Sequence, residues 1–583
     1  MAPENKIDEI RHSLAHLLAA AVLEKYPKTK LGIGPVIENG FYYDFKFSKP
    51  IPAEELPELE REMKRLISAS LPFSGEKLAP AKAKKIFKGQ PFKLELIKDF
   101  VKEKKDLTLY RTGDAFVDLC RGGHVANTKE INPDAFKLTH LAGAYWRGDE
   151  TKPMLTRIYA VAFASKKELD GHLKMLEEAK KRDHKKLGSE LGLFVFSELV
   201  GAGLPLWTPK GTILRDILDN FVWELRLKNG YQRVDIPHIA KKELYQKSGH
   251  WDKFQNEIFK IISREGHTFV LKPMNCPHHT QIYASQPRSY KELPICYANT
   301  TKVYRDEQTG ELSGLSRVRS ITQDDAHVFC RESQIEAEME IIWKMISEFY
   351  SRVGFSLSVR LSFHNPKEPK KYLGTPALWK KSEQTLKKLA EHQNTKTTEA
   401  IGEAAFYGPK VDFIAKDSLG RDWQVATIQL DLNLPERFDL TCVNESGKPE
   451  RIVMIHAAIM GSIERFIAIL IEHFAGAFPA WLAPTQVVVV PISEKQKNYA
   501  QKVVDTLHKN NVRTNLNDTN ETLGKRIRTS ELQKIPYILV VGDKEAQTNT
   551  VAVRRYGKGD LGGQTIDDFL KLITTEIQNK KAA

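Results

Sequence analysis

The sequence has few cysteines and no long apolar run. Its cysteines are scattered and form no CxxC pair; they are Cys120, Cys276, Cys296, Cys330 and Cys442. Such usage argues against a disulfide framework and leaves single thiols available as ligands. No stretch is apolar for long enough to cross a bilayer, so no membrane partner is expected.

The start of the chain also lacks the features of a targeting segment. MAPENKIDEIRHSLAHLL places acidic residues ahead of its apolar stretch. This order is typical of neither a signal peptide nor a transit peptide. We therefore expect the protein in the cytoplasm.

An acidic excess is absent as well. Lys and Arg total 88 against 74 for Asp and Glu, which gives a formal net charge of +14. A positive net charge is typical of proteins that bind a polyanion, although a basic surface that contacts only solvent would give the same composition. With 583 residues, 41% of them hydrophobic, the chain is too long for one core, and about three to four domains are expected.

The most informative stretch is TKVYRDEQTGELSGLSRVRSITQDDAHVFC, residues 301–330. Alternating β-branched and aromatic residues on both sides of a QTGELSG turn predict a β-hairpin. The alternation places Arg305 and Glu307 on one face of its first strand. Arg317 and Arg319 lie nearby. Together, the arginines and the acid predict a binding site for a ligand that has an anionic group next to a polar group. A solvated, salt-bridged surface ribbon would show the same pattern.

Three further motifs accompany this hairpin: LKPMNCPHH at 271–279, MIHAAIMGSIERF at 454–466 and AGAYWRGD at 142–149. Together and in this order, the four stretches resemble the signature motifs of class II aminoacyl-tRNA synthetases, and those of the threonyl-tRNA synthetase family in particular. The resemblance covers nearly the whole chain. It implies a multidomain α+β protein whose catalytic core is built on an antiparallel sheet.

The expected domains follow from this resemblance and from the order of helical and strand patterns. Residues 1–164 form an α+β editing domain and 165–190 a charged helical linker; residues 191–483 form the class II catalytic domain and 484–583 a C-terminal α/β anticodon-binding domain. The family often carries a ubiquitin-like domain ahead of the editing domain. His12 comes too early for it, so we expect a bacterial-type short form, with a shortened chain as the alternative.

Two pairs of polar residues mark the expected editing domain. His12 and His16 stand one helical turn apart, and VDLCRGGH provides a second pair, Cys120 and His124, at the same spacing and preceded by Asp118. Histidines at that spacing on an apolar helix are often ordinary half-buried residues. The two pairs fit either a four-ligand zinc set or a hydrolytic pocket without metal.

The resemblance to the editing domain shared by threonyl- and alanyl-tRNA synthetases favours hydrolysis without metal. The family usually has Pro where this chain has Gly123. The glycine loosens the backbone before His124.

An isolated Cys is ordinarily a buried structural thiol. The resemblance instead implies that Cys276, His327 and His456 bind one zinc ion and leave a fourth position open for substrate. Threonine can offer its amino and hydroxyl groups, whereas valine lacks the hydroxyl and would be rejected by roughly 10⁴ or more. Serine lacks only a methyl, which is worth about 10- to 200-fold, so a second, hydrolytic site is needed.

The resemblance also assigns residue roles. Arg305 and Arg465 hold the α- and γ-phosphates of ATP with Mg²⁺, Glu307 reads the adenine amine, and His250 acts as base in acyl transfer. The substrate pocket is expected to contain Gln323, Asp325, Tyr407, Lys410, Gln429, Arg317 and Ile321. Ile321 stands where the family has a Phe that stacks on adenine, which gives up ring stacking.

Two recognition surfaces are expected besides the active site. Residues 201–239 would build a homodimer interface, and Asn520, Glu545 and Arg554 would contact the anticodon. Thr519 and Thr522 replace an Arg and a Lys that relatives usually carry. We therefore expect fewer anticodon contacts than in those relatives.

The predicted function is ATP-dependent attachment of L-threonine to tRNA(Thr) through a threonyl-adenylate, with hydrolysis of mischarged seryl-tRNA(Thr). This is the activity of a threonine–tRNA ligase. A non-catalytic tRNA- or mRNA-binding paralogue is the alternative, and a freestanding hydrolase of mischarged tRNA is a third hypothesis. Presence of Arg305, Glu307 and Arg465 favours the enzyme.

Overall fold

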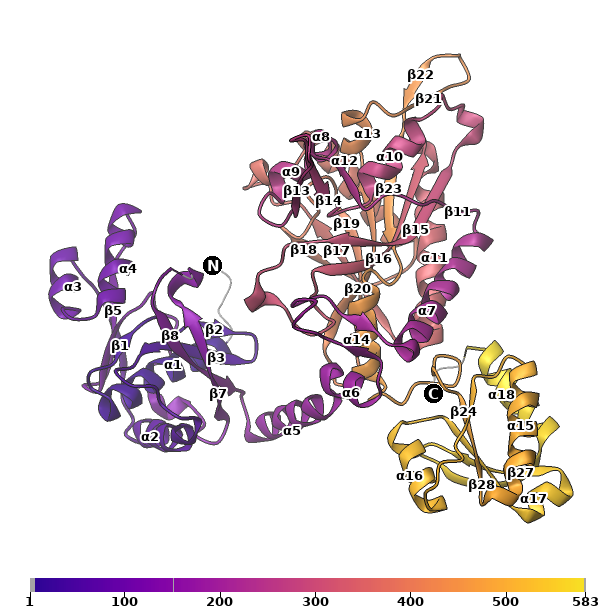
Figure 1. Ribbon diagram of the computed structural model, residues 1–583. Coiled ribbons are helices and arrows are strands. Elements are labelled where there is room, and N and C mark those ends of the chain that lie inside the picture. The colour runs from indigo at the N-terminus through magenta and orange to yellow at the C-terminus, as the bar shows by residue number, and fades with distance from the viewer. Residues whose placement is uncertain (1–5, 150, 581–583) are drawn as a thin grey trace. The chain divides into compact units, whose positions relative to one another are not determined.

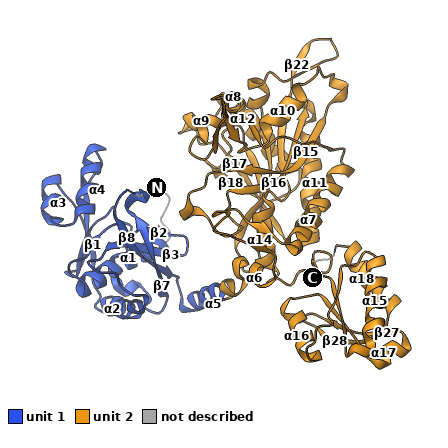
Figure 2. Ribbon diagram, viewed as in Figure 1, with its two compact units in different colours: residues 1–177 blue, residues 178–583 orange. Residues whose placement is uncertain are grey.

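The computed structural model describes residues 6–149 and 151–580 (Figure 1). The chain divides into two compact units, residues 1–177 and 178–583 (Figure 2). Among the described helices, none is long and apolar enough to cross a membrane.

Unit 1 is built around helix α1 (Lys6–Lys25), in which the run from Ser13 to Val22 is buried on every side. A helix that is apolar all round belongs inside a core, and α1 packs on the main sheet of the unit. The strands of that sheet are β1 (Lys30–Leu31), β2 (Val36–Ile37), β3 (Gly40–Lys46), β7 (Phe136–Tyr145) and β8 (Met154–Ala162). Their order is β1-β3-β8-β7, with β2 pairing with β3.

A smaller antiparallel sheet completes unit 1. Its strands are β4 (Phe73–Lys77), β5 (Thr108–Thr112) and β6 (Phe116–Leu119), and the neighbouring helices are α2 (Leu56–Ser68), α3 (Pro80–Ile86) and α4 (Pro91–Lys102). Strand β6 contacts α1. Asp118 lies on β6 and Cys120 directly follows it, so the two polar pairs predicted from the sequence meet at this contact.

The sequence of residues 165–194 predicts one charged amphipathic helix for the linker, but the helix is interrupted. Helix α5 (Lys166–Arg182) ends before Asp183, and α6 (His184–Glu190) begins after it. The Asp183 backbone is non-helical, and its side chain accepts a hydrogen bond from the Lys185 N–H at 2.7 Å. The prediction of one continuous helix was wrong because Asp is a strong N-cap residue and starts a new helix here.

Unit 2 contains an eight-stranded, mainly antiparallel sheet with the order β11-β15-β16-β23-β20-β19-β17-β18. The strands are β11 (Gln232–Arg233), β15 (Ile295–Tyr304), β16 (Ser320–Cys330), β17 (Leu357–Phe363), β18 (Thr397–Ile401), β19 (Lys410–Lys416), β20 (Asp422–Asp431) and β23 (Val453–Ala458). Helices α7 (Pro209–Lys228), α11 (Ile335–Val353) and α14 (Ile463–His473) pack against this sheet in the largest core cluster. The central strands β16, β23 and β20 position the candidate site.

The predicted hairpin is confirmed, since β15 and β16 pair antiparallel from Ile295 and Phe329 to Tyr304 and Ser320. However, β15 ends at Tyr304, so Arg305 and Glu307 lie in the loop and not on a strand face. The chain turns at once here because the Glu307 N–H bonds the Arg305 carbonyl at 2.9 Å. The prediction that both residues share a strand face was wrong for this reason.

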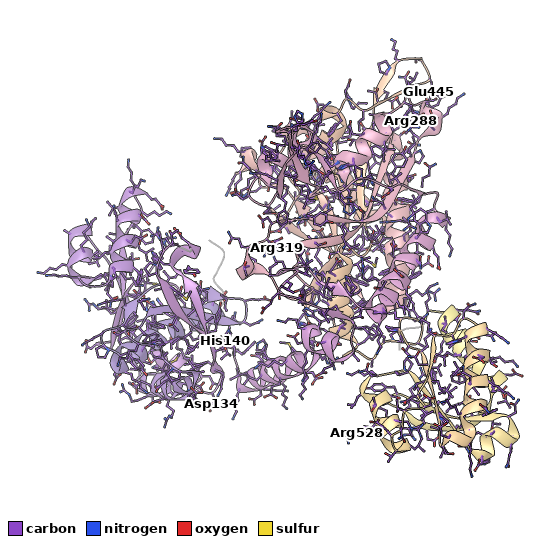
Figure 3. The ribbon with its side chains drawn as sticks, viewed as in Figure 1. Asp134, His140, Arg288, Arg319, Glu445 and Arg528 are labelled. Carbon is purple, nitrogen blue, oxygen red and sulfur yellow. The ribbon has the colours of Figure 1, made fainter. Side chains whose placement is uncertain are left out.

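Shorter elements surround the sheet. They are α8 (Lys242–Ser248), α9 (His250–Lys253), α10 (Cys276–Ala284), α12 (Pro376–His392), α13 (Asn433–Arg437), β9 (Phe194–Val195), β10 (Leu206–Trp207), β12 (Ile239–Lys241), β13 (Lys260–Ile262), β14 (Thr268–Leu271), β21 (Thr441–Val443) and β22 (Pro449–Arg451). Figure 3 places Arg288 and Glu445 at the β21–β22 end of this unit, where the Val443 N–H bonds the Arg288 carbonyl at 2.8 Å.

The C-terminal part is the α/β arrangement that the sequence predicts. Strands β25, β24 and β26 are parallel, and β27 and β28 extend the sheet antiparallel. The elements are β24 (Val487–Pro491), α15 (Lys497–Lys509), β25 (Thr514–Leu516), α16 (Leu523–Leu532), β26 (Tyr537–Val541), α17 (Asp543–Thr548), β27 (Thr550–Arg555), β28 (Gly559–Thr565) and α18 (Ile566–Gln578).

Candidate active site

A polar cavity of about 430 Å³ lies where the β15–β16 loop meets the start of α14. We call it the arginine pocket. It is lined by Arg305, Glu307, Ser316, Arg317, Val318, Ile321, Gln323, Gly461, Ser462 and Arg465. The structure thus brings together the hairpin residues and the distant GSIER motif that the sequence analysis singled out.

An ion pair shapes one wall of the arginine pocket. Arg317 donates from Nε and Nη2 to the Oε2 atom of Glu307, at 2.9 and 2.7 Å. Arg319, labelled in Figure 3, donates from Nε to the Glu307 carbonyl at 3.0 Å. Arg305 instead points Nη2 at the sulfur of Met274, at 3.5 Å. Glu307 is therefore held by two arginines, while the Arg305 guanidinium keeps a neutral neighbour.

Helix α14 presents Arg465 from the opposite wall. Its N-cap residue Ser462 accepts a hydrogen bond from the Arg465 N–H. The neighbouring Glu464 is buried and accepts from the Thr322 N–H at 2.8 Å, which fixes the helix start against β16. The Arg465 guanidinium lies 5.7 Å from the centre of the Trp423 ring, a cation–π contact.

Alternation along β16 gives its two consecutive acids different surroundings. Asp325 accepts a hydrogen bond from Asn275 Nδ2 at 3.0 Å, on the side of the candidate metal ligands. Asp324 points to the other face, where it is fully buried, pairs with Arg226, and accepts the Ile459 and Met460 N–H groups. Asp324 thus holds the turn between β23 and α14, a role that the sequence did not reveal.

Three predicted metal ligands come together in the middle of the sheet. Candidate ligand atoms of Cys276, His327 and His456 all lie within 4.8 Å of one another; we call these residues the Cys–His–His triad. The register of β16 and β23 places His327 opposite His456, with Nε2 and Nδ1 3.1 Å apart. All three side chains are buried.

Each triad histidine has a second partner on its other nitrogen. His456 Nε2 lies 2.9 Å from Asp431 Oδ2, and His327 Nδ1 lies 2.8 Å from His279 Nδ1. These contacts leave His327 Nε2 and His456 Nδ1, 3.1 Å apart, as the two nitrogens available for a metal shared with Cys276. Histidine ligands of zinc typically bond a carboxylate or similar group through the second nitrogen, so the donor set fits a zinc ion.

Burial shifts the pKa of two triad residues, Cys276 and His327. It raises the pKa of the Cys276 thiol well above its usual value. Burial, and then the charge of His456, lowers the pKa of His327. The neutral imidazole is the form that binds metal, and a bound cation would displace the thiol proton.

Side chains on β19, β20 and the turn before them surround the triad. The Tyr407 ring stacks on His456 with centres 4.7 Å apart, and its hydroxyl donates to Gln429 Oε1 at 2.5 Å. Lys410, opposite Gln429 in the β19–β20 register, pairs with Asp412 at 3.3 Å. Tyr407 and Gln429 therefore stand beside the triad, whereas Lys410 is engaged with a buried acid.

His250 is fully buried at the start of α9 and not exposed on a loop. Its Nδ1 lies 2.8 Å from Ser248 Oγ, whose hydroxyl donates to the Tyr245 carbonyl. Ser248 must then accept the Nδ1 hydrogen, which leaves Nε2 as a lone pair 3.7 Å from Cys276 Sγ. Burial, followed by the charge of His456, lowers the pKa of His250 to about 3, so the ring is a neutral base.

Unit 1 contains a separate cavity of about 410 Å³, lined in part by His12, His16, Asp118 and Cys120. Cys120 Sγ lies 3.4 Å from His12 Nε2 and 3.2 Å from His124 Nε2. Candidate ligand atoms of His12, His16, Cys120 and His124 lie within 4.8 Å of one another. The predicted editing residues therefore share one site in which both alternatives, a zinc set and a metal-free pocket, remain chemically sensible.

The unit 1 cavity also contains a buried Lys that the sequence analysis missed. Lys93 pairs with Asp118 Oδ1 at 2.6 Å, and the Tyr43 hydroxyl donates to Asp118 Oδ2 at 2.6 Å. Lys is seldom buried unless paired. The only signal was its position among apolar residues in PFKLELI. Burial raises the pKa of Cys120 to about 11, so its thiol is neutral.

The glycine in place of the family's Pro has a backbone that Pro cannot adopt. Gly123 has φ +82°, whereas Pro is fixed near −65°. The loop before His124 therefore follows a path specific to Gly.

The predicted anticodon residues lie on separate elements of the C-terminal part. Asn520 is exposed ahead of α16, Glu545 Oε2 accepts the Gly542 N–H at 2.9 Å, and Arg554 pairs with Glu531 at 3.7 Å. Thr522 caps α16, since its hydroxyl accepts from the Lys525 N–H. That residue therefore has a local structural role.

Comparison with protein-family models identifies the class of protein. Residues 259–474 match the tRNA synthetase class II core domain (G, H, P, S and T), and residues 486–576 match the anticodon binding domain. Residues 107–159 match the threonyl and alanyl tRNA synthetase second additional domain. The chain is thus a class II aminoacyl-tRNA synthetase with an editing domain and an anticodon-binding domain.

The similar proteins narrow this assignment. The chain is 49% identical to a threonine–tRNA ligase from Gloeobacter violaceus, over 99% of this chain and 93% of that protein. It is 46% identical to one from Cytophaga hutchinsonii, over 98% and 89% of the two chains. The protein belongs to the threonine–tRNA ligase family.

A solved structure agrees with this result. The crystallised RNA binding domain of threonyl-tRNA synthetase from Cryptosporidium parvum Iowa II superimposes with a TM-score of 0.65 and 35% identity. The match covers 68% of this chain and 98% of that one.

Proposed function

We propose that this chain makes threonyl-tRNA through a threonyl-adenylate, with the Cys–His–His triad and the arginine pocket as neighbouring halves of one active site. By family the chain is a threonine–tRNA ligase, which joins threonine to tRNA with ATP and edits its product. One observation carries the finer proposal. Strand β16 presents Ile321 and Gln323 to the arginine pocket and, at the same alternation, Asp325 and His327 to the triad.

Threonine recognition is assigned to the triad side. Cys276, His327 and His456 would hold a zinc ion, which supplies a Lewis-acidic position for the amino and hydroxyl groups of threonine. Asp325, with Tyr407 and Gln429 beside the triad, would orient the same groups. Valine offers no hydroxyl to this polar site and is rejected on that account.

ATP binding is assigned to the arginine pocket. Arg305 would face the α-phosphate, where charge develops as the carboxylate attacks, and Arg465 the γ-phosphate, with Mg²⁺ bound to the nucleotide. Glu307, positioned by Arg317, would accept from the adenine amine. Ile321 would contact the base without ring stacking. Positioning and electrostatics account for this step, which needs no activated nucleophile on the protein.

The second step uses His250. Its lone pair on Nε2 is set by the Ser248 contact on Nδ1, so the ring is ready to take the proton of the tRNA terminal hydroxyl as that oxygen attacks the adenylate. We assign hydrolysis of seryl-tRNA to the unit 1 cavity, where His12, His16, Asp118, Cys120 and His124 would position water.

Exposed apolar residues support the homodimer proposal. Next to the predicted interface segment, Val195, Phe196, Leu199 and Val200 are 50%, 43%, 100% and 44% exposed. Exposed apolar patches of this kind mark association surfaces. We further propose the domain boundaries 1–164, 165–190, 191–483 and 484–583, anticodon contacts by Asn520, Glu545 and Arg554, and a cytoplasmic location.

Amino-acid-dependent ATP–pyrophosphate exchange with threonine, serine and valine tests the proposal, with metal content measured on the same sample. We expect exchange with threonine, weaker exchange with serine and almost none with valine, at about one zinc per chain. A folded protein that binds tRNA but shows no exchange would overturn the catalytic proposal. Equal exchange with valine would overturn the zinc-based selection alone.

A further inference from the structure

We propose that His184 is a positioning residue for ATP: the two edges of its imidazole ring join the loop that carries Arg317 to the helix that carries Arg465. His184 lies outside both the arginine pocket and the Cys–His–His triad. The proposal rests on the roles proposed above for Arg317 and Arg465.

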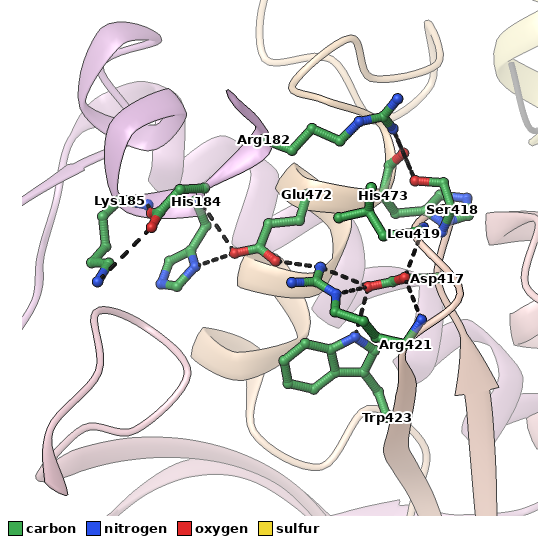
Figure 4. A network of polar contacts seen from close by, with 11 residues as sticks. Arg182, His184, Lys185, Asp417, Ser418, Leu419, Arg421, Trp423, Glu472 and His473 are labelled. Carbon is green, nitrogen blue, oxygen red and sulfur yellow. Dashed lines mark hydrogen bonds and ion pairs between the residues drawn. The ribbon is translucent and has the colours of Figure 1, made fainter. Parts of the chain in front are cut away.

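The ring of His184 is buried and contacts two elements that are far apart in sequence. Nδ1 lies 2.6 Å from Glu472 Oε1 on α14, and Nε2 lies 3.1 Å from the backbone N–H of Leu315 in the β15–β16 loop. Figure 4 shows the Glu472 contact beside the rest of the network. The Leu315 N–H can only donate, so Nε2 accepts, and Nδ1 carries the hydrogen that is donated to Glu472.

The contact between His184 and Leu315 lies close in sequence to Arg317, a residue proposed to line the ATP site. Leu315 is fully buried in the main core and stands two positions before Arg317, which holds Glu307. Gly314 has φ +51°, and a β-carbon there would lie 2.3 Å from His184 Nε2. The loop therefore packs against the ring so closely that only Gly fits.

On the helix side, a chain of polar contacts runs from Glu472 to Trp423, as Figure 4 shows. Glu472 Oε2 accepts from Arg421 Nη2 at 2.5 Å, and Arg421 also bonds Asp417. Asp417 Oδ2 accepts from the Trp423 indole at 2.8 Å. Trp423 in turn lies beneath the Arg465 guanidinium. His184 therefore affects Arg465 both through α14 itself and through the Trp423 ring.

Contacts of the neighbouring residues hold His184 in place. His184 is the first residue of α6, with Asp183 as its cap. Directly before it, the Arg182 side chain bonds Ser418 Oγ at 2.9 Å and the His473 carbonyl at 3.3 Å. These contacts anchor the chain directly before α6, so the imidazole ring joins the loop to α14 from an anchored position.

Steady-state ATP–pyrophosphate exchange with purified full-length variants tests the proposal. In His184→Ala we expect the KM for ATP to rise by about tenfold or more, because small misplacements of charged groups cost that much. The KM for threonine should stay within about twofold, because the His184 ring bonds Glu472 and Leu315, whereas the triad residues lie on α10, β16 and β23. A merely structural role would lower the melting temperature and the active fraction and leave both KM values unchanged.

Two conservative variants separate the two edges of the ring. His184→Asn places an amide N–H near the Nδ1 position and keeps the bond to Glu472, whereas His184→Gln places an oxygen near Nε2 and keeps the bond to Leu315. Each should recover part of the ATP affinity lost in the Ala variant. Equal KM values for ATP in all three variants and the wild type would overturn the proposal.

Two glycines of the β15–β16 loop test the same contact from the loop side, Gly314 with a positive φ beside the ring and Gly310 without either feature. Gly314→Ala pushes a methyl against the ring and should raise the KM for ATP as His184→Ala does. Gly310 lies in the same loop, and a β-carbon there meets no heavy atom within 4 Å, so Gly310→Ala should behave as wild type. If His184→Ala does not fold, an unchanged KM for ATP in Gly314→Ala still overturns the proposal. Wild-type exchange in parallel tests the proposed function itself.

Discussion

Alternation along β16 assigns neighbouring residues to different surroundings. Asp325 lies on the side of the Cys–His–His triad and accepts from Asn275, and Asp324 is buried against Arg226 and two backbone N–H groups. Replacing Asp324 would therefore disturb the α14 start, whereas replacing Asp325 would disturb the triad side. At the residue scale, the face of the strand on which a side chain lies decides its surroundings more than its chemical type does, because successive side chains point to opposite faces.

Cys276→Ser tests the metal assignment. We expect zinc content to fall well below one per chain and exchange with threonine to drop by about 100-fold or more, since Ser is a poor zinc ligand. Cys442→Ser is the matched control, because Cys442 is also buried but lies outside the triad. Full zinc content in Cys276→Ser, measured by inductively coupled plasma mass spectrometry, would contradict the assignment.

His250→Ala separates the two steps of the reaction. Aminoacyl transfer to tRNA should slow by about 10² to 10⁴, the usual contribution of a general base. ATP–pyrophosphate exchange should remain close to wild type, because adenylate formation does not use this proton. A single-turnover assay that starts from preformed adenylate measures the rate of aminoacyl transfer to tRNA. Parallel losses in both assays would show that His250 instead supports the whole pocket.

The sequence motifs predicted the candidate metal ligands and editing residues, but not the buried residues that form hydrogen bonds or ion pairs with them. Cys276, His327 and His456 belong to specific sequence motifs, whereas Lys93 and Asp431 do not. Lys93 and Asp431 contribute to the sites because they are buried beside Asp118 and His456, respectively. Burial of a charge depends on which segments the fold brings together, which local sequence does not contain.

At the element scale, local signals placed the hairpin and the C-terminal α/β part correctly and misplaced their ends. The β15 strand stops at Tyr304 because the loop bonds its own backbone. The linker helix breaks at Asp183 because a side-chain cap competes with helix continuation. Both differences concern capping and turn geometry, which tertiary contacts decide.

Glu472→Gln tests the network that joins α6, α14 and β20. Burial would raise the pKa of Glu472, but hydrogen bonds from His184 and Arg421 lower it overall. A folded-state pKa below the unfolded value of about 4.3 adds stability at neutral pH that is lost as pH falls through the folded value. The wild type should therefore melt higher than the variant at pH 7, and the gap should narrow toward pH 3.

Differential scanning fluorimetry across that pH range measures the gap in melting temperature. The exposed Glu348 on α11 provides a control, since Glu348→Gln should leave the melting temperature nearly unchanged. A gap of constant size from pH 7 to pH 3 would contradict an ionised Glu472 in the network.

Gly123→Pro tests the loop that carries His124. Pro cannot adopt the φ of +82° seen here, so we expect hydrolysis of seryl-tRNA to fall by about 10-fold or more while threonine activation is retained. Gly148→Pro, at another left-handed glycine in unit 1 with φ +72° and no heavy atom near its β-carbon position, controls for strain alone. Unchanged deacylation in Gly123→Pro would remove this loop from the editing proposal.

At the scale of the whole molecule, synthesis and editing are assigned to different compact units. The unit 1 cavity and the arginine pocket share no lining residue. Variants in one unit should therefore leave the chemistry of the other intact. The division between a synthetic and a hydrolytic part was predictable from motifs, whereas the position of the unit boundary inside α5 was not.

Val195→Asp combined with Phe196→Asp tests the proposed homodimer. Two carboxylates on this exposed apolar segment should convert a dimer into a monomer, because their desolvation opposes association. Ile262→Asp is the control, at a residue that is 67% exposed but outside the segment. Sedimentation velocity reports the mass. A dimer that survives both substitutions places the interface elsewhere.

The neighbours of the two proposed phosphate-facing arginines have a kinetic consequence. Arg305 contacts a thioether and Arg465 an aromatic ring, whereas the nearby carboxylates of Glu307, Asp324 and Glu464 are already bonded within the protein. Among residues 6–149 and 151–580, no carboxylate pairs with either guanidinium, so both positive charges remain available to a ligand in the pocket. Such charges attract a polyanion from a distance and are screened by salt, so the association rate of ATP should fall with ionic strength while its dissociation rate changes little.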